Sequence, residues 1–334
     1  MKRRGQPVVT SGWSRRGVLG AALGMPFAIK AAAQTYPSRS AHMIVPFPAG
    51  GPTDVLARIA AEKVSPGFGQ QIVVESRSGA GGNIAGEFTV RSEADGYTLL
   101  VAGQAILAIN KALYKKLPYD PAADLTFVSM LGVIANVLLI NPKTVPVNSL
   151  AELIALAKKK PGDISYGSNG PGSLTHLTTA IMAHQAGVDL LHVPYQGAAP
   201  LMTDLLAGRI GMTFIAASTA LPLVQSGQLR ALAVTTGKRS RFSADVPTLV
   251  ESGFPSLDAP TWFALVVLAK TPVPILTRLR REFNALVTSE GYSKALEERS
   301  MEVMLVPPET SEQFLAKERN LWSDAVKLTG VTLD

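Results

Sequence analysis

Short apolar runs rich in valine, isoleucine and leucine alternate with longer segments of helical period from Met43 to the end of this 334-residue chain. Such alternation is typical of an α/β fold, because a buried parallel strand needs a crossover, usually a helix, before the next parallel strand begins. The chain is also long enough for two domains of ordinary size. The pattern predicts strands at 43–46, 72–75, 97–101, 127–131, 137–141, 164–167, 191–194, 211–215, 229–234, 263–269 and 301–305.

The organisation along the chain predicts two lobes that interleave in sequence. No low-complexity linker separates two independent halves, and the helical stripe at 311–328 still needs a core to cover it. The extended segments 127–141 and 256–269 are therefore the candidate crossings from one lobe to the other. With these crossings, lobe 1 comprises residues 36–135 plus 261–334, and lobe 2 comprises residues 136–260.

The first 33 residues have the composition of a signal peptide. They contain six basic side chains and no acidic one, and their apolar stretch at 18–29 is much shorter than the roughly 20 residues needed to span a bilayer. Arg15 and Arg16 form a twin-arginine pair, and alanines up to Ala33 supply the small residues that a signal peptidase requires. We therefore expect export to the periplasm with cleavage after Ala33. Lys30 favours the Tat route, although Sec signals also carry paired arginines.

Removal of this leader changes the charge of the protein. The whole chain carries +7, and six of these charges lie in the leader, so the remaining residues carry only +1. A nearly neutral protein has no electrostatic basis for binding nucleic acid, and no such partner is expected. The sequence contains no cysteine, which excludes disulfides, thiolate catalysis, thiolate metal ligands and a lipid-modified cysteine.

A Gly-Gly-Pro turn joins the first expected strand to the first expected helix. The segment reads Val45-Pro46-Phe47-Pro48-Ala49-Gly50-Gly51-Pro52-Thr53-Asp54, and apolar residues of helical spacing follow it. Glycine permits a close backbone approach, proline suits the first helical position, and a helix N-terminus presents unpaired N–H groups with a partial positive charge. The turn is therefore a candidate anion site, although the same residues would also make a tight turn without any ligand.

Two further loops have the same strand–loop–helix form. One is Val193-Pro194-Tyr195-Gln196-Gly197-Ala198-Ala199-Pro200, which repeats the Val-Pro-aromatic start and the later proline of the first turn, and its helix repeats the Thr-Asp pair at 203–204. The other is the polar, glycine-rich loop at 166–176. No arginine or lysine lies inside any of the three loops. An anion would therefore be held by helix N-termini and N–H groups, each contributing on the order of 1 kcal/mol.

These loops supply most of the candidate ligand-binding residues. Phe47 and Tyr195 would form flanking walls, and hydroxyl and amide side chains of the 166–176 loop would supply adjustable hydrogen bonds. Asp54 and Asp204 are poor partners for an anion and would instead order their loops, hold bridging water or simply cap a first helical turn. The candidate set is Phe47, Ala49, Gly50, Gly51, Thr53, Asp54, Gln104, Ser168, Asn169, Ser173, Thr175, Tyr195, Gly197, Ala198 and Asp204.

Four segments of the sequence point to one family. They are the 45–54 turn, the Tyr166-Gly167-Ser168 loop with Gly172-Ser173, the stretch from Val193-Pro194-Tyr195 to Asp204-Leu205-Leu206-Ala207-Gly208, and Asp245-Val246-Pro247-Thr248-Leu249 before Gly253-Phe254. Together they resemble the receptors of tripartite tricarboxylate transporters, the Bug or TctC type, over essentially the whole chain after the leader.

That resemblance implies a type II periplasmic-binding-protein fold. Its two lobes close like a Venus flytrap over a carboxylate, which is held by backbone amides, hydroxyls and bridging waters. The implied ligand is a dicarboxylate, a tricarboxylate, an acidic amino acid or an aromatic carboxylate. The implied partners are the membrane subunits of such a transporter.

Two other classes of function would use the same loops. A sensor that presents its loaded form to a signalling partner needs the same binding site, and the sequence does not separate it from a transport receptor. An exported hydrolase would use Ser173 with His176, but no neighbouring acid orients a base, and no G-x-S-x-G or phosphate-binding motif is present.

We therefore expect a monomeric receptor without catalytic activity, cofactor or metal. The four histidines lack the spacing and the further ligands of a zinc site. Two tryptophans follow the leader. Trp262 lies on the proposed return crossing and is expected to report ligand binding, whereas Trp322 lies on the C-terminal helix, remote in sequence from every binding loop.

Overall fold

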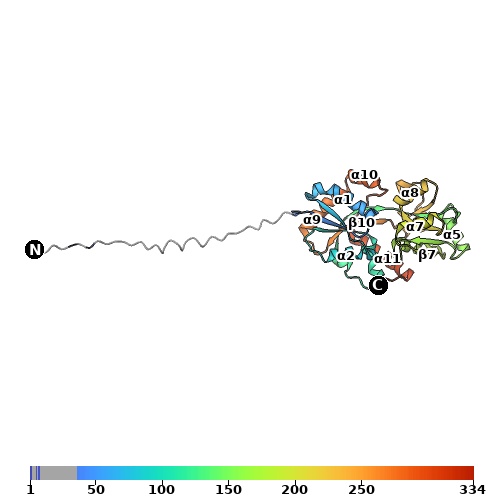
Figure 1. Ribbon diagram of the computed structural model, residues 1–334, viewed down its shortest axis with the longest axis horizontal. Coiled ribbons are helices and arrows are strands. Elements are labelled where there is room, and N and C mark those ends of the chain that lie inside the picture. The colour runs from blue at the N-terminus through green and yellow to red at the C-terminus, as the bar shows by residue number, and fades with distance from the viewer. Residues whose placement is uncertain (2–4, 6, 8–35) are drawn as a thin grey trace. The chain divides into compact units, whose positions relative to one another are not determined.

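The computed structural model describes residues 1, 5, 7 and 36–334, so the expected twin-arginine pair and cleavage site lie outside the described residues. Residues 36–334 contain two five-stranded sheets. Figure 1 shows β10 of the first sheet and β7 of the second in opposite halves of this region, which we call lobe 1 and lobe 2. Within the described residues, every helix is too short or too polar to cross a membrane.

The first sheet has the strand order β2-β1-β3-β10-β4. Strand β1 runs parallel to β2 and β3, and β10 runs antiparallel to β3 and β4. The strands are β1 (Ala41–Val45), β2 (Ile72–Ser76), β3 (Thr98–Ala102), β4 (Leu125–Ile134) and β10 (Thr261–Leu268). The helical elements beside them are α1 (Pro52–Phe68), η1 (Ala80–Gly82), α2 (Asn83–Val90), η2 (Ala105–Ile109), α3 (Asn110–Leu113), α4 (Pro121–Asp124), α9 (Val273–Val287) and α10 (Glu290–Glu297).

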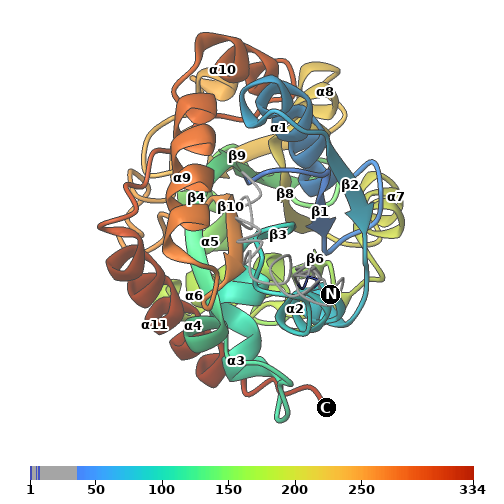
Figure 2. The same ribbon diagram turned by 90° about the vertical axis from the view of Figure 1, so that its left-hand side faces the viewer.

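Both faces of this sheet are buried. Leu99 and Val101 of β3 pack into the core formed with α1 and α9, whereas Leu100 and Ala102 pack into a second core on the opposite face. This alternation follows from the two-residue period of a strand. Figure 2 shows α9 lying along β4 and β10. The sheet is therefore a rigid support for the loops at its edge.

The second sheet has the strand order β7-β6-β8-β5-β9. Strand β6 runs parallel to β7 and β8, and β5 runs antiparallel to β8 and β9. The strands are β5 (Asn136–Ile140), β6 (Ser165–Ser168), β7 (Leu191–Pro194), β8 (Met212–Ala216) and β9 (Arg230–Val234). The helical elements beside them are α5 (Leu150–Lys159), α6 (Leu174–Ala186), α7 (Ala198–Leu206), α8 (Ala217–Gln225) and η3 (Arg241–Ser243).

The chain passes between the sheets at two points. Only Ala135 separates β4 of the first sheet from β5 of the second. On the return, the Ala259 N–H donates to the Thr235 carbonyl beside the second sheet (2.8 Å), and β10 of the first sheet begins at Thr261. Pro260 therefore lies at the second crossing.

The C-terminal helix α11 (Ser311–Thr329) adds a third link. Its Leu315 packs in a core of lobe 1, whereas Trp322 and Val326 pack in a core that includes Leu177 of α6. Helix α11 therefore contacts both lobes.

The predicted strands agree with the observed ones except at 301–305, where the prediction was wrong. Only Glu302 pairs there, through two backbone hydrogen bonds with Val133 of β4 (2.8 and 2.9 Å). Of the apolar residues that suggested a strand, Met301, Val303 and Met304 pack in or against the cores of lobe 1 instead, whereas Leu305 is exposed. Burial, rather than strand pairing, accounts for the hydrophobicity of Met301, Val303 and Met304.

Candidate functional site

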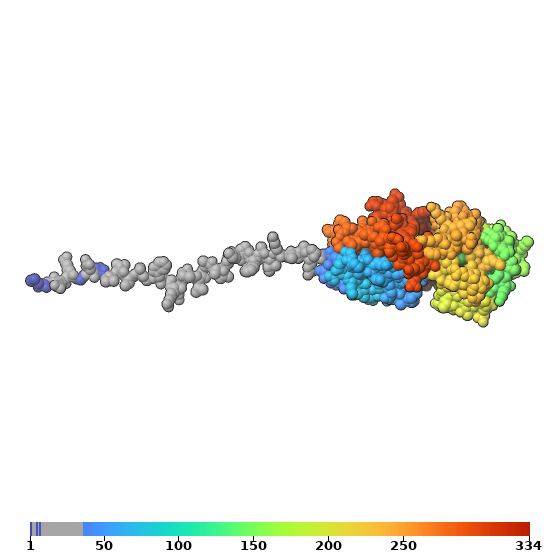
Figure 3. Space-filling model, turned by 90° about the horizontal axis from the view of Figure 1, so that it is seen from above, coloured from blue at the N-terminus to red at the C-terminus, as the bar shows by residue number. Residues whose placement is uncertain are grey.

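A cavity of about 740 Å³ lies between the two lobes. Its wall combines the loop after β1 and the loop after β3 from lobe 1 with the loops after β6, β7 and β8 from lobe 2. In the space-filling view the surface is indented where the blue and red-orange surface of lobe 1 meets the yellow surface of lobe 2 (Figure 3). The volume is within the range of about 300–1,000 Å³ that small-molecule sites occupy.

The structure brings nine of the fifteen candidate residues to this cavity. They are Phe47, Gly51, Thr53, Gln104, Asn169, Ser173, Thr175, Tyr195 and Ala198. The other six do not line it, and they are Ala49, Gly50, Asp54, Ser168, Gly197 and Asp204. Three of these six, Asp54, Ser168 and Asp204, form hydrogen bonds with residues of the loops.

The turn before α1 leaves its first N–H groups open to the cavity. Gly51 is the N-cap residue and provides no side chain to cap the helix. The carboxylate of Asp54 instead accepts from the Gly50 N–H (2.9 Å) and from Arg58 Nε (3.0 Å). Gly50 has a φ of +83°, which favours glycine there. No acceptor for the Thr53 N–H is found among the described residues.

Asp54 is therefore an ordering residue of this turn. Burial alone raises the pKa of Asp54, but the hydrogen bonds from Arg58 and Gly50 outweigh this effect and leave the pKa below its ordinary value. Its carboxylate stays charged and holds the Gly50 amide. The Gly50 N–H is consequently not available to a ligand.

The turn before α7 is built in a similar way. Gly197 is the N-cap residue, again without a side-chain cap, and its φ is +101°. The Tyr195 hydroxyl donates to Asp204 (2.8 Å), and Arg209 Nη1 donates to the other carboxylate oxygen (2.7 Å). Burial, and then the Asp204 carboxylate, raise the pKa of Tyr195 to about 12, so its hydroxyl remains a donor. Among the described residues, no acceptor for the Ala198 N–H is found.

The loop before α6 differs, because its N–H groups already have partners inside the chain. The Asn169 N–H donates to Thr175 Oγ1 (3.1 Å), and the Gly172 N–H donates to His176 Nδ1 (3.1 Å). The Gly170 N–H donates to Ser168 Oγ (3.2 Å), and Ser173 Oγ caps the helix by accepting from the His176 N–H (3.4 Å). This loop therefore forms a polar wall whose Asn169, Gly170 and Gly172 N–H groups are occupied internally, whereas no acceptor for the Leu174 and Thr175 N–H groups at the start of α6 is found among the described residues.

A stack of three aromatic rings, which was not predicted from the sequence, supports this loop. The rings of Tyr166, His176 and His192 are parallel within about 21°, with centroids 4.0 Å apart for the two histidines and 4.9 Å apart for Tyr166 and His192. Burial, and then the neighbouring His192, lower the pKa of His176 to about 4. His176 is therefore neutral at neutral pH, with Nδ1 free to accept from Gly172.

Neither serine–histidine pair in this region is arranged as a nucleophile with its base. His192 Nε2 lies 2.7 Å from Ser168 Oγ, but Ser168 is completely buried. Ser173 Oγ donates to the Gly170 carbonyl (2.6 Å), while the Nδ1 atom of His176 is occupied by Gly172. A reactive hydroxyl needs an accessible position beside a free base.

The second crossing also reaches the cavity. Gln104 lines it, but its amide Nε2 donates to the Pro260 carbonyl (2.5 Å) and its Oε1 accepts from the Trp262 N–H (3.3 Å). Asn136 and Thr261, which also line the cavity, are joined side chain to side chain at 2.9 Å. Gln104, a candidate ligand-binding residue, therefore lines the cavity while both ends of its amide hold the crossing in place.

The apolar residues of the cavity were not predicted from the sequence. They include Ile106, Ile109, Leu113, Tyr114 and Leu333. Three of them fall at positions i, i+3 and i+7, which is helical spacing. That spacing predicts only a buried face, because a core and a cavity wall have the same periodicity.

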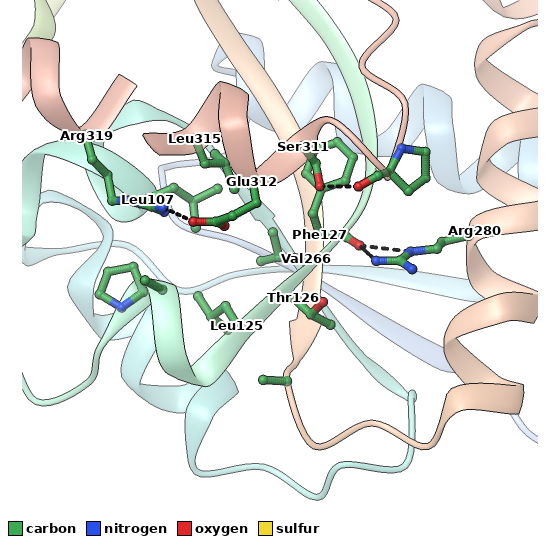
Figure 4. Close-up of a pocket in the computed structure, with 14 residues that line it drawn as sticks. Leu107, Leu125, Thr126, Phe127, Val266, Arg280, Ser311, Glu312, Leu315 and Arg319 are labelled. Atoms are coloured by element: carbon green, nitrogen blue, oxygen red, sulfur yellow. Dashed lines mark hydrogen bonds and ion pairs between the residues drawn. The ribbon is translucent and has the colours of Figure 1, made fainter. Parts of the chain in front are cut away.

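A smaller cavity of about 340 Å³ lies within lobe 1, at the start of α11 (Figure 4). Arg280 donates through Nε and Nη2 to the Phe127 carbonyl (3.2 and 2.9 Å), and Arg319 forms an ion pair with Glu312. Both cations are therefore already partnered. Residues 36–334 contain no cluster of three or more histidine, aspartate or glutamate side chains arranged to hold a metal ion.

Comparison with known proteins agrees with this geometry. The family described as the tripartite tricarboxylate transporter family receptor matches residues 56–331. BugT of Bordetella pertussis is 38% identical over 302 residues, which cover 90% of this chain and 92% of BugT. The solved structure of R. palustris Rpa4515 with adipate is 35% identical with a TM-score of 0.79, and the match covers 89% of this chain and 99% of that one.

Two further solved structures are similar. The periplasmic binding protein BugD has a TM-score of 0.75 at 30% identity, covering 89% of this chain and 99% of BugD. MatC of Rhodopseudomonas palustris with bound malate has a TM-score of 0.75 at 27% identity, covering 87% of this chain and all of that one. These matches confirm the expected two-lobed type II periplasmic-binding-protein fold and a solute-binding receptor rather than an enzyme. The chain belongs to the tripartite tricarboxylate transporter receptor family.

Proposed function

We propose that this protein captures a small organic carboxylate in the periplasm and delivers it to the membrane subunits of a tripartite tricarboxylate transporter. The observation that carries the proposal is a pair of helix N-termini without side-chain caps, α1 from lobe 1 and α7 from lobe 2, that meet one cavity. Each offers N–H groups and a partial positive charge to an anion. The adipate and malate named for two similar structures are both carboxylates, which supports this choice.

We propose further that the lobes 36–135 plus 261–334 and 136–260 close over the ligand about the crossings at Ala135 and Pro260. The Asn136–Thr261 hydrogen bond joins the two crossings (2.9 Å), and α11 links the lobes a third time. A ligand that touches both lobes favours the closed state by its higher affinity for that state.

Export is part of the proposal and has its own test. The mature chain is expected to begin at Gln34, after the signal peptide of residues 1–33. Intact-mass measurement of the periplasmic protein checks this, and retention of residues 1–33 would contradict it. Replacing Arg15 and Arg16 by lysine should block export only if the Tat route is used.

The binding proposal is tested with the protein as purified from its periplasm. Mass spectrometry of the retained small molecule should identify a carboxylate. Calorimetry with that acid and with its neutral amide should show binding of the acid alone, because helix N-termini favour an anion. Acid at about 100 times its dissociation constant should stabilise the fold by roughly 2.7 kcal/mol. A retained compound without a carboxylate, or equal binding of the amide, would overturn the proposal.

The transport partner needs a separate experiment. Crosslinking in membranes, with and without the retained acid, should capture the membrane subunits of a tripartite transporter. Capture of a signalling protein in their place would identify a sensor. Conversion of the acid to a product would identify an enzyme.

A further inference from the structure

The last residues of the chain form part of the cavity wall. Helix α11 ends at Thr329, and Gly330 follows it with a φ of +64°, a left-handed conformation that favours glycine and ends the helix. Three residues later, Leu333 lines the cavity. The tail 330–334 therefore contributes a side chain to the site, although it lies outside the strand–loop–helix turns.

The tail is held in place by its backbone. The Leu333 N–H donates to the Leu113 carbonyl (2.8 Å), and the Leu333 carbonyl accepts from the Lys115 N–H (3.0 Å), so the C-terminal end lies beside α3 (Figure 2). Lys115 also pairs with Asp334 (2.7 Å), but both side chains are largely exposed and the ion pair adds little. The side chain of Leu333 takes part in none of these bonds. A different side chain at 333 is therefore presented to the cavity by the same backbone pairing.

Leu333 bounds the cavity where the two lobes meet. It packs in the hydrophobic cluster of Leu113 and Leu174, whereas Tyr195 of the α7 turn packs in another cluster, which also contains residues of α1. A Cβ atom on Gly172 would stand 2.5 Å from Leu113 Cδ2, so the α6 loop of lobe 2 packs directly on the residue that holds the tail. The tail therefore closes a part of the cavity distinct from the α1 and α7 turns.

This part of the cavity also contains polar groups. Tyr114 lines it and pairs with Leu333 as an isolated β-bridge. A Cβ atom on Gly81, another lining residue, would lie 3.2 Å from the Tyr114 hydroxyl. The Leu174 and Thr175 N–H groups lie at the start of α6, and both residues line the cavity. A ligand that reaches the tail can therefore end in an apolar or a polar group, and Leu333 restricts its length rather than its chemistry.

Resting on the proposed function, we propose that Leu333 is a specificity-determining residue that sets the length of the acid this receptor accepts. The acid is elongated. Its carboxylate lies at the N-termini of α1 and α7, and its body extends toward α3 and the tail, where the side chain of Leu333 stops it. Each methylene group that moves from water into the cavity raises the affinity about fourfold, and a methylene group that collides with Leu333 loses this gain.

Two homologous series of acids test the proposal by calorimetry on the mature protein freed of retained ligand. One series is the straight-chain dicarboxylates from succinate to azelate, and the other is the straight-chain monocarboxylates from butyrate to nonanoate. In at least one series, the affinity of the parent protein should rise with chain length, reach a maximum at a preferred length and then fall. That series is used for the variants.

Two substitutions of Leu333 should move the preferred length in opposite directions. Leu333→Ala removes most of the side chain, so the preferred acid should become longer. The affinity for the next longer acid, relative to that for the acid the parent protein prefers, should rise at least fourfold. Leu333→Phe extends the side chain, so the preferred acid should become shorter. Loss of stability does not produce opposite shifts, because it weakens the binding of every acid alike.

Val331→Ala is the matched control. Val331 lies on the same tail and packs, partly buried, against the same hydrophobic cluster, but it does not line the cavity. The Val331→Ala protein should keep the preferred length of the parent, whatever stability it loses. Circular dichroism and thermal unfolding of the three variants show whether each fold is retained.

The outcomes separate this inference from the proposed function. An unchanged preferred length in folded Leu333 variants, or an equal shift in Val331→Ala, overturns the role of Leu333 and leaves the carboxylate receptor standing. A parent protein that binds no acid of either series, or shows no maximum within them, also overturns it. The receptor proposal itself fails only if the retained compound has no carboxylate or its amide binds as well as the acid.

Discussion

The indole N–H groups of Trp262 and Trp322 donate to the same carboxylate oxygen, Glu318 Oε2, at 2.7 and 3.0 Å. Trp262 lines the cavity, and Trp322 lies in a core to which both lobes contribute. One buried carboxylate therefore joins the cavity wall to the helix that spans both lobes. Trp322 is remote in sequence from the binding loops but is separated from the cavity by only two hydrogen bonds.

This relationship changes the expected fluorescence of the two tryptophans. In the mature Trp322→Phe protein, the bound acid should shift the emission of Trp262, which contacts the cavity. In the mature Trp262→Phe protein, a smaller but measurable shift of Trp322 is expected, because movement of Glu318 alters its hydrogen bond. Titration of both variants with the retained acid, read by emission spectra, checks this. A silent Trp262 would show that the ligand lies elsewhere.

Glu318 gives a second prediction, on the pH dependence of stability. Burial raises the pKa of Glu318, and the hydrogen bonds from Trp262 and Trp322 offset this only in part. The pKa of Glu318 in the folded protein therefore exceeds its unfolded value of about 4.3. The contribution of Glu318 to the free energy of unfolding is complete at pH values below the unfolded pKa, and it is lost as the pH rises through the folded pKa. Glu318→Gln keeps an acceptor oxygen and does not titrate. Its stability relative to the parent should therefore increase with pH.

Urea unfolding from pH 4 to pH 8 measures this difference. Glu318→Leu serves as the comparison, because it leaves two buried indole N–H groups without an acceptor. That variant should be less stable at every pH, by about 1–3 kcal/mol for each orphaned donor. Parallel pH profiles for Glu318→Gln and the parent protein would contradict the assignment.

The sequence predicted the strands and the three strand–loop–helix turns at the cavity because both have local signals. A short continuous apolar run marks β3, and the Gly-Gly-Pro turn at 50–52 marks the start of α1. Loop ordering was one of the roles expected for Asp54 and Asp204, beside the binding of bridging water and helix capping. Their hydrogen bonds to Gly50 and Tyr195 have that geometry.

The remaining features depend on contacts between distant parts of the chain. Leu333 reaches the cavity only because its backbone pairs with Leu113, 220 residues away along the chain. The amide of Gln104 has both its ends occupied by the 260–262 segment, which no local pattern reveals. Sequence periodicity reports that a side chain is buried but not which partner buries it.

Gly51 and Gly197, the N-cap glycines of α1 and α7, give a third prediction, because their substitution should have different effects on stability. Gly51 lines the cavity, its φ is −75°, and an added Cβ would lie 3.4 Å from the Pro48 carbonyl oxygen, which is ordinary contact. Gly51→Val should therefore abolish binding of the retained acid with little loss of stability. Gly197 has a φ of +101° and does not line the cavity, so Gly197→Val should also destabilise the fold, by about 1–3 kcal/mol.

Gly253→Val is the control for backbone strain. Gly253 has a φ of +98° and open space around it, but it is not part of the cavity wall. It should lose stability and keep its affinity. Calorimetry and thermal unfolding of the three variants separate the two effects. Normal binding by Gly51→Val would show that the turn before α1 is not part of the site.

The last prediction concerns the ring stack behind the α6 loop. Burial, and then His192, lower the pKa of His176 to about 4, below the unfolded value of about 6.5. A histidine with a lowered folded pKa contributes stability above its unfolded pKa, and this contribution is lost as the pH falls toward 4. His176→Asn keeps an oxygen able to accept from the Gly172 N–H and does not titrate. Its unfolding midpoint should therefore fall less between pH 6.5 and pH 4 than that of the parent protein.

The exposed residue His184 provides the matched control, because it lies on the same helix and takes the same substitution to asparagine. His184→Asn should keep the pH profile of the parent. Some dependence should remain in His176→Asn, since burial also lowers the pKa of His192. A His176→Asn protein as sensitive to acid as the parent would mean that His176 takes up its proton without disturbing the Gly172 hydrogen bond. The loop that forms the polar wall of the cavity would then not depend on the ring stack.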